Sequence, residues 1–335
     1  MAIAYTGVKG HKNQTDRISL LFEKKIMPGT LLFSGPSGIG KKLIARRTIS
    51  AFFCESSNPP CLDCRDCRQI EEGIHPDFIF LSPNEKGIIP IGSEDKKEEG
   101  SVRWIIERLS MKSVSGKRAA LIDGVDRMRI EGQNAILKTI EEPSPGTVLF
   151  LIASGTAGIL PTILSRCFGI KFGPLSVGDI LDLLEKKMLI NDHSPVIAEI
   201  SGGSVENAIS ISEGETLLEL RNLCGSINAF YLREGIWEAA TTELEKTLGA
   251  ERLVDILVNI YRRNLMYLLR GPEGVIDDDF FGSSFLTDEA SARRMIGLLL
   301  RAKKAMARNI GIQGSLRGLI SSETVTGAVT LSEYF

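Results

Sequence analysis

A glycine-rich segment near the N-terminus has the residue types and the spacing of a phosphate-binding loop. It runs Gly35-Pro36-Ser37-Gly38-Ile39-Gly40-Lys41, directly after an apolar run (31–33) and directly before a helical stretch. Glycines let backbone N–H groups turn towards a phosphate, the start of the helix adds positive potential, and the lysine adds a full charge. Because strand, loop and helix follow in the required order, we expect a nucleotide site whose phosphates contact Gly35, Gly38, Gly40 and Lys41.

Two further positions of such a site carry residues that cannot arrange magnesium and water. Lys42 stands where the motif has a hydroxyl that ligates Mg²⁺, and an ammonium has no lone pair to offer. The apolar run 119–122 ends in Asp123, which has the position of the aspartate that holds the Mg²⁺ shell, but Gly124 follows where related ATPases usually carry a glutamate. We expect Lys42 and Asp123 to belong to a degenerate nucleotide site that does not hydrolyse ATP, and we leave ATP or ADP binding open. Alternatively, Asp123 is only a polar strand end.

Four of the six cysteines are close together in the sequence, in the pattern Cys54-x6-Cys61-x2-Cys64-x2-Cys67. Four thiolates at such spacings suit a closed tetrahedral zinc site, and Pro59-Pro60 is typical of a non-helical turn between ligands. No histidine lies nearby to suggest an open catalytic position. We therefore predict a structural Zn²⁺ site, with unpaired thiols as the alternative.

The composition is that of an ordinary globular protein and excludes some classes of function. The chain has 335 residues, of which 43% are hydrophobic and 24% charged, and its net charge of -2 argues against a general polyanion binder. It has no apolar run of the roughly 18 residues that a membrane span needs, and residues 1–13 lack the apolar core of a signal peptide. We expect a cytoplasmic protein with no membrane contact.

The elements that must position these residues follow an alternating order in the first half of the chain. Strand-like runs at 31–33, 77–81, 119–122 and 148–153 alternate with helical stretches at 41–53, 102–112 and 131–140, which predicts an α/β fold with a parallel sheet. We expect the polar, glycine-rich segment 84–100 to be a surface loop. From Ser176, which begins a capping box, the pattern becomes helical, with a small helical region at 175–212 and further helices at 253–265 and 292–308.

Several stretches together resemble one family, the clamp-loader ATPases of bacterial DNA replication. The resemblance rests on the phosphate loop, the four-cysteine insertion after the first helix, and the stretches His75-Pro76-Asp77, 123–128, 134–143 and 160–167. It implies a RecA-like AAA+ core over residues 1–174, a helical lid over 175–212 and a helical collar over 213–335. It also implies gamma/tau and delta subunits as partners in a ring, and contact with the sliding clamp and primer-template DNA through the complex.

The resemblance gives Arg166, in Ser165-Arg166-Cys167, a role as an arginine that reaches the ATP of a neighbouring subunit. Such an arginine stabilises charge on the transferred phosphoryl group. The alternative is an ordinary surface ion pair. Glu206 stands where the family's ATP-hydrolysing members carry a lid arginine, so the pattern is similar to that of the delta-prime subunits.

The leading hypothesis is therefore a delta-prime-like subunit that does not hydrolyse ATP alone and counts as part of the DNA polymerase III holoenzyme, a nucleotidyltransferase, only through its complex. One alternative is an ATP-hydrolysing gamma/tau-like motor. An alternative of another class is a stand-alone zinc-containing ATPase that binds nucleic acid, against which the neutral charge and the lack of interleaved aromatic and basic residues argue.

Overall fold

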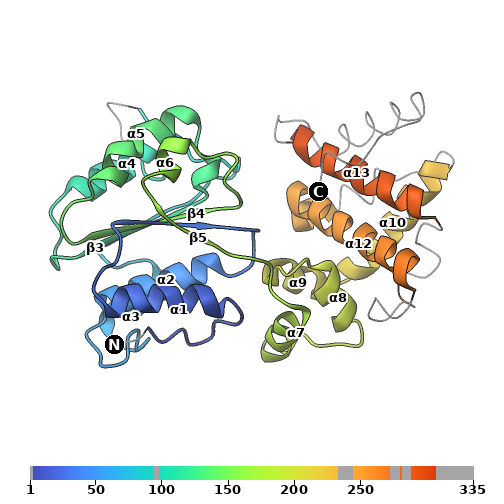
Figure 1. Cartoon of the computed structure of the whole chain (residues 1–335), viewed down its shortest axis with the longest axis horizontal. Coiled ribbons are helices and arrows are strands. Elements are labelled where there is room, and N and C mark those ends of the chain that lie inside the picture. Colours follow the sequence, from blue (N-terminus) through green and yellow to red (C-terminus); the bar gives the residue numbers. More distant parts are fainter. Residues whose placement is uncertain (1–2, 94–97, 233–243, 272–279, 281–287, 307–335) are drawn as a thin grey trace. The chain divides into compact units, whose positions relative to one another are not determined.

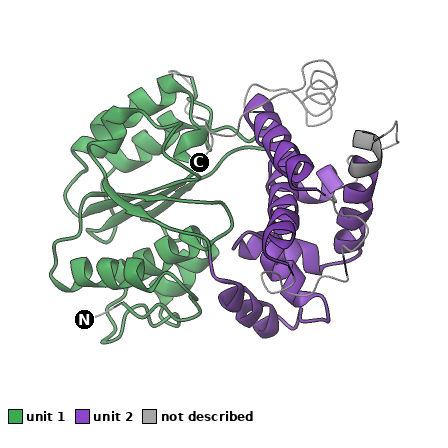
Figure 2. Cartoon of the chain, turned by 45° about the vertical axis from the view of Figure 1, so that its right-hand side comes forward, with its two compact units in different colours: residues 1–174 green, residues 175–335 purple. Residues whose placement is uncertain are grey.

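The structure is a computed structural model that describes residues 3–93, 98–232, 244–271, 280 and 288–306. It divides into two compact units, Met1–Pro174 and Leu175–Phe335 (Figure 2). None of the described helices is long and apolar enough to cross a membrane.

The first unit is built on a parallel sheet of five strands. In chain order these are β1 (Thr30–Ser34), β2 (Phe78–Leu81), β3 (Arg118–Asp123), β4 (Thr147–Ala153) and β5 (Phe168–Lys171). Their order across the sheet is β2-β3-β4-β1-β5. The three central strands are near-continuous apolar runs because both of their faces are covered, as is usual in parallel sheets.

Helices cover both faces of this sheet (Figure 1). One face carries α1 (Lys12–Glu23), α2 (Lys41–Phe53) and α3 (Arg65–Glu72), and the other carries α4 (Val102–Ser110), α5 (Ile130–Glu141) and α6 (Pro161–Leu164). Alternate side chains of one strand enter different cores: Leu31 and Phe33 pack with the first group of helices, and Leu32 packs with the second. The predicted α/β fold with a parallel sheet is confirmed.

Several elements of the first unit, among them β5, α1 and α3, were not expected from the sequence. Strand β5 is a short edge strand in which only Ile170 is buried, so it has no run of apolar residues. Helices α1 and α3 are polar on most of their surface and bury only Thr15 and Ile18, and Cys67 and Ile70, respectively. The formation of these elements depends more on packing against the rest of the unit than on a hydrophobic pattern in their own sequence.

The segment 84–100 is only partly the surface loop that we expected. Among its described residues, Ile89 is 1% exposed and packs into the core below α4 and α5. Its backbone N–H donates to the Arg127 carbonyl at 3.2 Å, and it forms an isolated parallel bridge with Met128. Ile89 therefore anchors this part of the connection in the core.

The described part of the second unit is helical. It contains α7 (Val177–Lys186), α8 (Ser194–Ile200), α9 (Val205–Ser212), α10 (Thr216–Leu232), α12 (Ala250–Arg270) and α13 (Glu289–Met306). The predicted capping box is present: the Ser176 hydroxyl accepts from the Asp179 N–H, and the Asp179 carboxylate accepts from the Ser176 N–H. Helix α12 buries the predicted face of Leu253, Ile256, Leu257, Ile260 and Leu265.

One hydrophobic core runs from Leu175 in the lid region to Ala302 on α13. Polar contacts join the same elements: Arg263 on α12 donates through Nε to Glu199 on α8 at 2.7 Å, and Asn259 donates to the Ile200 carbonyl at 3.2 Å. The division into a lid (175–212) and a collar (213–335) stays a prediction. Of the amphipathic stretch expected at 292–308, the last two residues lie outside the described part.

Candidate functional site

The phosphate loop connects β1 to α2 and has the backbone form that its glycines allow. Gly35 has φ 147°, and a Cβ there would lie 2.2 Å from the Phe172 carbonyl oxygen after β5. Gly38 and Gly40 have φ 72° and 99°, in the left-handed region that side chains disfavour. The loop thus places the first turn of α2 at the carboxyl end of β1, where a helix N-terminus attracts anions.

Lys41, the first residue of α2, is buried, with 5% of its surface exposed. Its ammonium donates to the Gly35 carbonyl at 2.6 Å and also contacts the Pro36 carbonyl. Burial lowers the pKa of Lys41 to about 8, and the negative charges of Asp123 and Asp126 oppose this shift. The amine therefore donates to loop carbonyl groups, whose place a phosphate oxygen would take.

Lys42 lies against the aspartate expected to hold magnesium. Its Nζ is 3.2 Å from Asp123 Oδ2 and 4.4 Å from the centre of the Phe80 ring. Asp123 is the last residue of β3, so the sheet brings its carboxylate to the start of α2. An ammonium thus pairs with the carboxylate for which the sequence predicts a role in Mg²⁺ binding, and the degenerate site itself stays a prediction.

Gly124 begins the short 3₁₀ turn η1 (Val125–Arg127) and has a left-handed backbone with φ 94°. A Cβ at this position would lie 3.1 Å from Pro83 Cγ and 3.2 Å from Arg127 Cγ. The backbone here is shaped for glycine, so the position that carries a glutamate in related ATPases is unsuited to a side chain.

Two contacts of this region were missed in the sequence. Asp126 Oδ2 accepts from the Ser154 N–H at 3.1 Å and contacts its hydroxyl, which ties the turn after β3 to the end of β4. His11 hydrogen-bonds through Nε2 to the Ile39 carbonyl in the phosphate loop at 2.8 Å, and its ring meets Phe172 edge-on at 5.1 Å. No spacing rule links these residues, and only the position of polar groups just after strand ends hints at Asp126 and Ser154.

Arg166 lies in the turn between α6 and β5, and its contacts are with its own turn and with α5. Nε is 3.3 Å from Glu141 Oε2, and Nη2 donates to Glu141 Oε1 at 3.4 Å. Nη1 donates to the Thr162 carbonyl at 3.0 Å and to the Ser165 hydroxyl at 3.4 Å. The side chain is 35% exposed, so both the ion pair and contact with another molecule are open to it.

Glu206, at the start of α9, pairs with Arg252 on α12. Arg252 Nη1 lies 3.0 Å from Glu206 Oε1, and the same guanidinium donates to Asn207, to the Glu206 carbonyl and to Ser210. The position where related motors carry a lid arginine is therefore a carboxylate engaged within the second unit.

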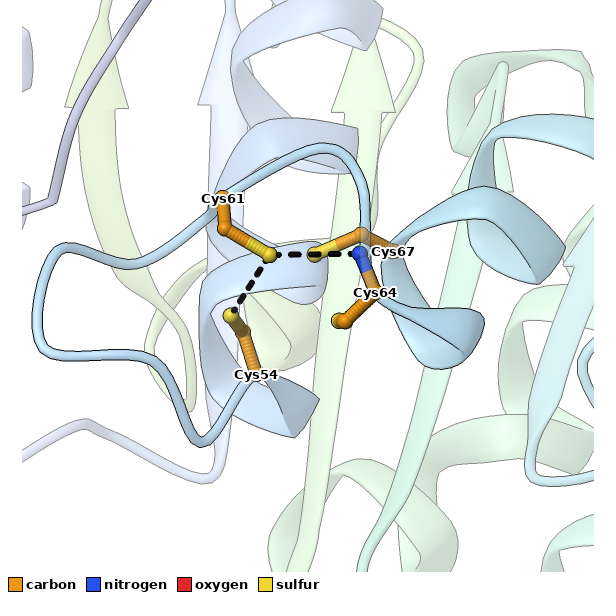
Figure 3. A group of neighbouring side chains, drawn as sticks. All are labelled: Cys54, Cys61, Cys64 and Cys67. Atoms are coloured by element: carbon orange, nitrogen blue, oxygen red, sulfur yellow. Dashed lines mark hydrogen bonds between the residues drawn. The ribbon is translucent and has the colours of Figure 1, made fainter.

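The four clustered cysteines meet between the end of α2 and the start of α3 (Figure 3). Cys54 is the C-cap of α2, Cys64 is the N-cap of α3, and Cys67 lies in the first turn of α3. Their sulfur atoms all lie within 4.8 Å of one another, and those of Cys54 and Cys61 are 3.7 Å apart. Sulfurs on a tetrahedral zinc are about 3.8 Å apart when each Zn–S bond is about 2.3 Å.

The donor set therefore fits a closed metal site. Hydrogen bonds from the backbone N–H groups of Asp63 and Cys64 lower the pKa of Cys61 to about 6, so this sulfur favours the thiolate form that metals bind. His75 is buried, its ring centre lies 4.5 Å from that of Phe53, and its Nδ1 accepts from the Asp77 N–H at 3.2 Å.

A family model described as "DNA polymerase III, delta subunit" matches residues 10–176. A DNA polymerase III subunit delta' from Bacillus subtilis is 28% identical over 316 residues, covering 89% of this chain and 91% of the relative. A subunit delta' from Pseudomonas aeruginosa is 33% identical over 138 residues, covering 41% of this chain and 40% of the relative.

A tau subunit also matches part of the chain. The tau subunit of Escherichia coli DNA polymerase III is 34% identical over 194 residues, covering 54% of this chain and 28% of tau. The fold, the phosphate loop and these matches agree, and the chain belongs to the family of DNA polymerase III clamp-loader subunits, as a delta-prime type close to gamma and tau.

Proposed function

We propose that this subunit does not hydrolyse ATP itself and instead offers Arg166 to ATP bound by a neighbouring subunit of the loader. The observation that carries the proposal is the ion pair between Lys42 and Asp123, which puts a protein cation on the carboxylate that a motor would use for Mg²⁺. The glycine backbone at Gly124 supports the same conclusion, because no carboxylate there can orient a water molecule.

The role of Arg166 is supported by its position on an exposed turn and by its guanidinium chemistry. Arginine stays charged at any working pH and presents planar N–H groups that match phosphate oxygens. Supplied in trans, such a group neutralises charge that develops on the transferred phosphoryl and is worth about 10³–10⁵ in rate. In this proposal the neighbours are gamma/tau and delta subunits, and the assembled ring places the sliding clamp on primer-template DNA.

The cysteine cluster holds a structural Zn²⁺ in this proposal, with Cys54, Cys61, Cys64 and Cys67 as ligands. Support comes from four sulfur donors, no histidine or water-accepting position among them, and separations that suit tetrahedral geometry. The ion would fix the end of α2, the helix whose first turn forms the phosphate loop.

The test is the ATPase rate of the ring assembled with a motor subunit. Arg166→Ala should lower turnover by about 10³ or more, and Arg166→Lys should restore little, because a point charge lacks the planar fork. Arg129→Ala, at another exposed arginine of the first unit, is the matched control and should leave the rate unchanged. Full turnover by the Arg166→Ala ring would refute the trans role.

The similarity to tau keeps a motor role as the second candidate. A motor predicts steady ATP hydrolysis by the isolated chain, and the leading proposal predicts none. Measuring phosphate release by the purified subunit, with a motor subunit as the positive reference, separates the two.

A further inference from the structure

The guanidinium of Arg166 is held along one edge by a carboxylate from another element. Glu141 is the last residue of α5, and its two oxygens contact Arg166 Nε and Nη2 at 3.3 and 3.4 Å, respectively. We infer that Glu141 is a positioning residue that fixes the direction of Arg166 before a neighbouring subunit's nucleotide arrives. This inference rests on the proposed trans role of Arg166.

The placement of Glu141 supports a role beyond a chance surface pair. The C-terminal end of a helix carries partial negative charge, so a carboxylate there is unfavourable unless a cation compensates it. Helix α5 nevertheless ends in two carboxylates, Glu141 and then Glu142 at the C-cap. Of the two, only Glu141 pairs with an arginine among the described residues, whereas Glu142 has the same charge and is its neighbour at the same helix end.

Contacts with its own turn also restrain the guanidinium of Arg166. Nη1 donates to the Thr162 carbonyl of α6 and to the Ser165 hydroxyl. The guanidinium therefore has contacts both with α5 and with its own turn. With the Glu141 contacts, all three nitrogens of the guanidinium therefore have a partner. Nη2 carries two N–H groups and donates one hydrogen bond, so its second N–H can contact an anion while Glu141 still accepts from the first.

Pairing with Glu141 should reduce the conformational entropy that the Arg166 side chain loses when it binds a phosphate. A long exposed arginine loses rotamer freedom when it is fixed. A bidentate carboxylate fixes it in advance, so less of this entropy is lost when the phosphate binds, and the charged group already points in one direction. Because a misplaced group acts poorly in a transition state, loss of Glu141 should lower turnover more than substrate affinity.

The first experiment uses the ring assembled with a motor subunit. Glu141→Gln should lower kcat by about tenfold and leave KM within about twofold, because the amide cannot accept both N–H groups of the arginine edge. Glu141→Asp should recover part of the rate. Glu142→Gln is the matched control and should behave as the unmodified chain.

The second measurement asks whether Glu141 acts through Arg166. In the Arg166→Ala background, Glu141→Gln should cause no further loss, because residues that act as a unit are not additive. In the isolated full-length chain, the Nε–H signal of Arg166, assigned with Arg166→Lys, should exchange faster with water in Glu141→Gln and not in Glu142→Gln.

The outcomes separate this inference from the proposed function. If Arg166→Ala lowers turnover and Glu141→Gln does not, the positioning role is overturned and the trans arginine stands. Equal losses from Glu141→Gln with and without Arg166 also overturn it, because the effect would then be structural. If Arg166→Ala itself has no effect, the trans role fails and the inference fails with it.

Discussion

Lys42 pairs with Asp123 at 3.2 Å at the start of a helix where positive side chains are otherwise unfavourable. Two lysines in the first turn of α2 are favourable only if negative groups lie near them, and Asp123 is one such group. The other group for which the loop is shaped is a phosphate. The ammonium of Lys42 would then neutralise part of the phosphate charge, as Mg²⁺ does in an active site.

If the phosphate loop of this subunit binds a nucleotide, its affinity should therefore be insensitive to Mg²⁺. We expect the Kd of a fluorescent ADP analogue to change by less than about twofold between excess Mg²⁺ and excess EDTA, because Lys42 blocks the metal's carboxylate. Lys42→Thr should restore a metal dependence of about tenfold, and Lys12→Thr on α1 is the control. Tighter binding by the unmodified chain in Mg²⁺ would contradict this account.

A single substitution at Gly124 should not rebuild a motor. Gly124→Glu introduces a side chain at φ 94° and brings its Cβ against Pro83, so we expect a loss of about 1–2 kcal/mol of unfolding free energy and no ATP hydrolysis. Gly124→Asn should cost less, since asparagine tolerates this backbone region. Chemical denaturation and a phosphate-release assay check both statements, and steady hydrolysis by Gly124→Glu would refute them.

At the scale of elements, the cysteine cluster joins α2 to α3 at the end of α2 opposite to the phosphate loop. Cys54 and Cys67 are buried, and Cys61 is exposed on the connecting segment. Apart from the cysteines, α3 is held to α2 by the burial of Ile70 and by the contacts of Arg46 and Arg47 with Glu71. A bound ion would cross-link the two helix ends and limit their relative movement.

The purified chain should contain about one zinc per molecule, and its removal should lower stability. A metal present at about 1,000 times its Kd contributes about 4 kcal/mol, so chelation or Cys64→Ser should lower the unfolding temperature by several degrees. Cys167→Ser, outside the cluster, should retain the zinc. Elemental analysis and thermal unfolding measure both effects, and a metal-free chain of unchanged stability would exclude the site.

At the scale of the whole molecule, each of the two units has hydrophobic packing of its own. Two cores lie on the two faces of the sheet in Met1–Pro174, and a third joins the helices of Leu175–Phe335. Burial of apolar side chains is the main source of folding stability. We therefore expect each unit to unfold cooperatively by itself.

A cavity in one core should leave the other unit unaffected. Leu257 on α12 is fully buried, so Leu257→Ala should cost about 2–5 kcal/mol and lower the unfolding transition of the second unit. With Trp237 replaced by Phe, Trp104 on α4 is the one tryptophan left and reports the first unit. Its fluorescence transition should stay within about one degree in Leu257→Ala, and a joint shift of both transitions would show that the units unfold together.

Features encoded by local spacing could be predicted from the sequence. The phosphate loop, the faults at Lys42 and Gly124, the capping box at Ser176 and the apolar face of α12 each depend on neighbouring residues or on one period. The cysteine spacing predicted the cluster for the same reason. The central strands were also visible, because burial on both faces requires continuous apolar runs.

Contacts between residues far apart in the chain were decided by the tertiary structure. The parallel sheet brings strand ends to one edge, and this places Asp123 on Lys42 and Ser154 on Asp126. Packing also set Ile89 into the core and Glu141 against Arg166. The sequence alone determined which chemical groups are present and which are missing, and only the fold decided which of them meet, because an ion pair or hydrogen bond depends on distance in space and not on separation along the chain.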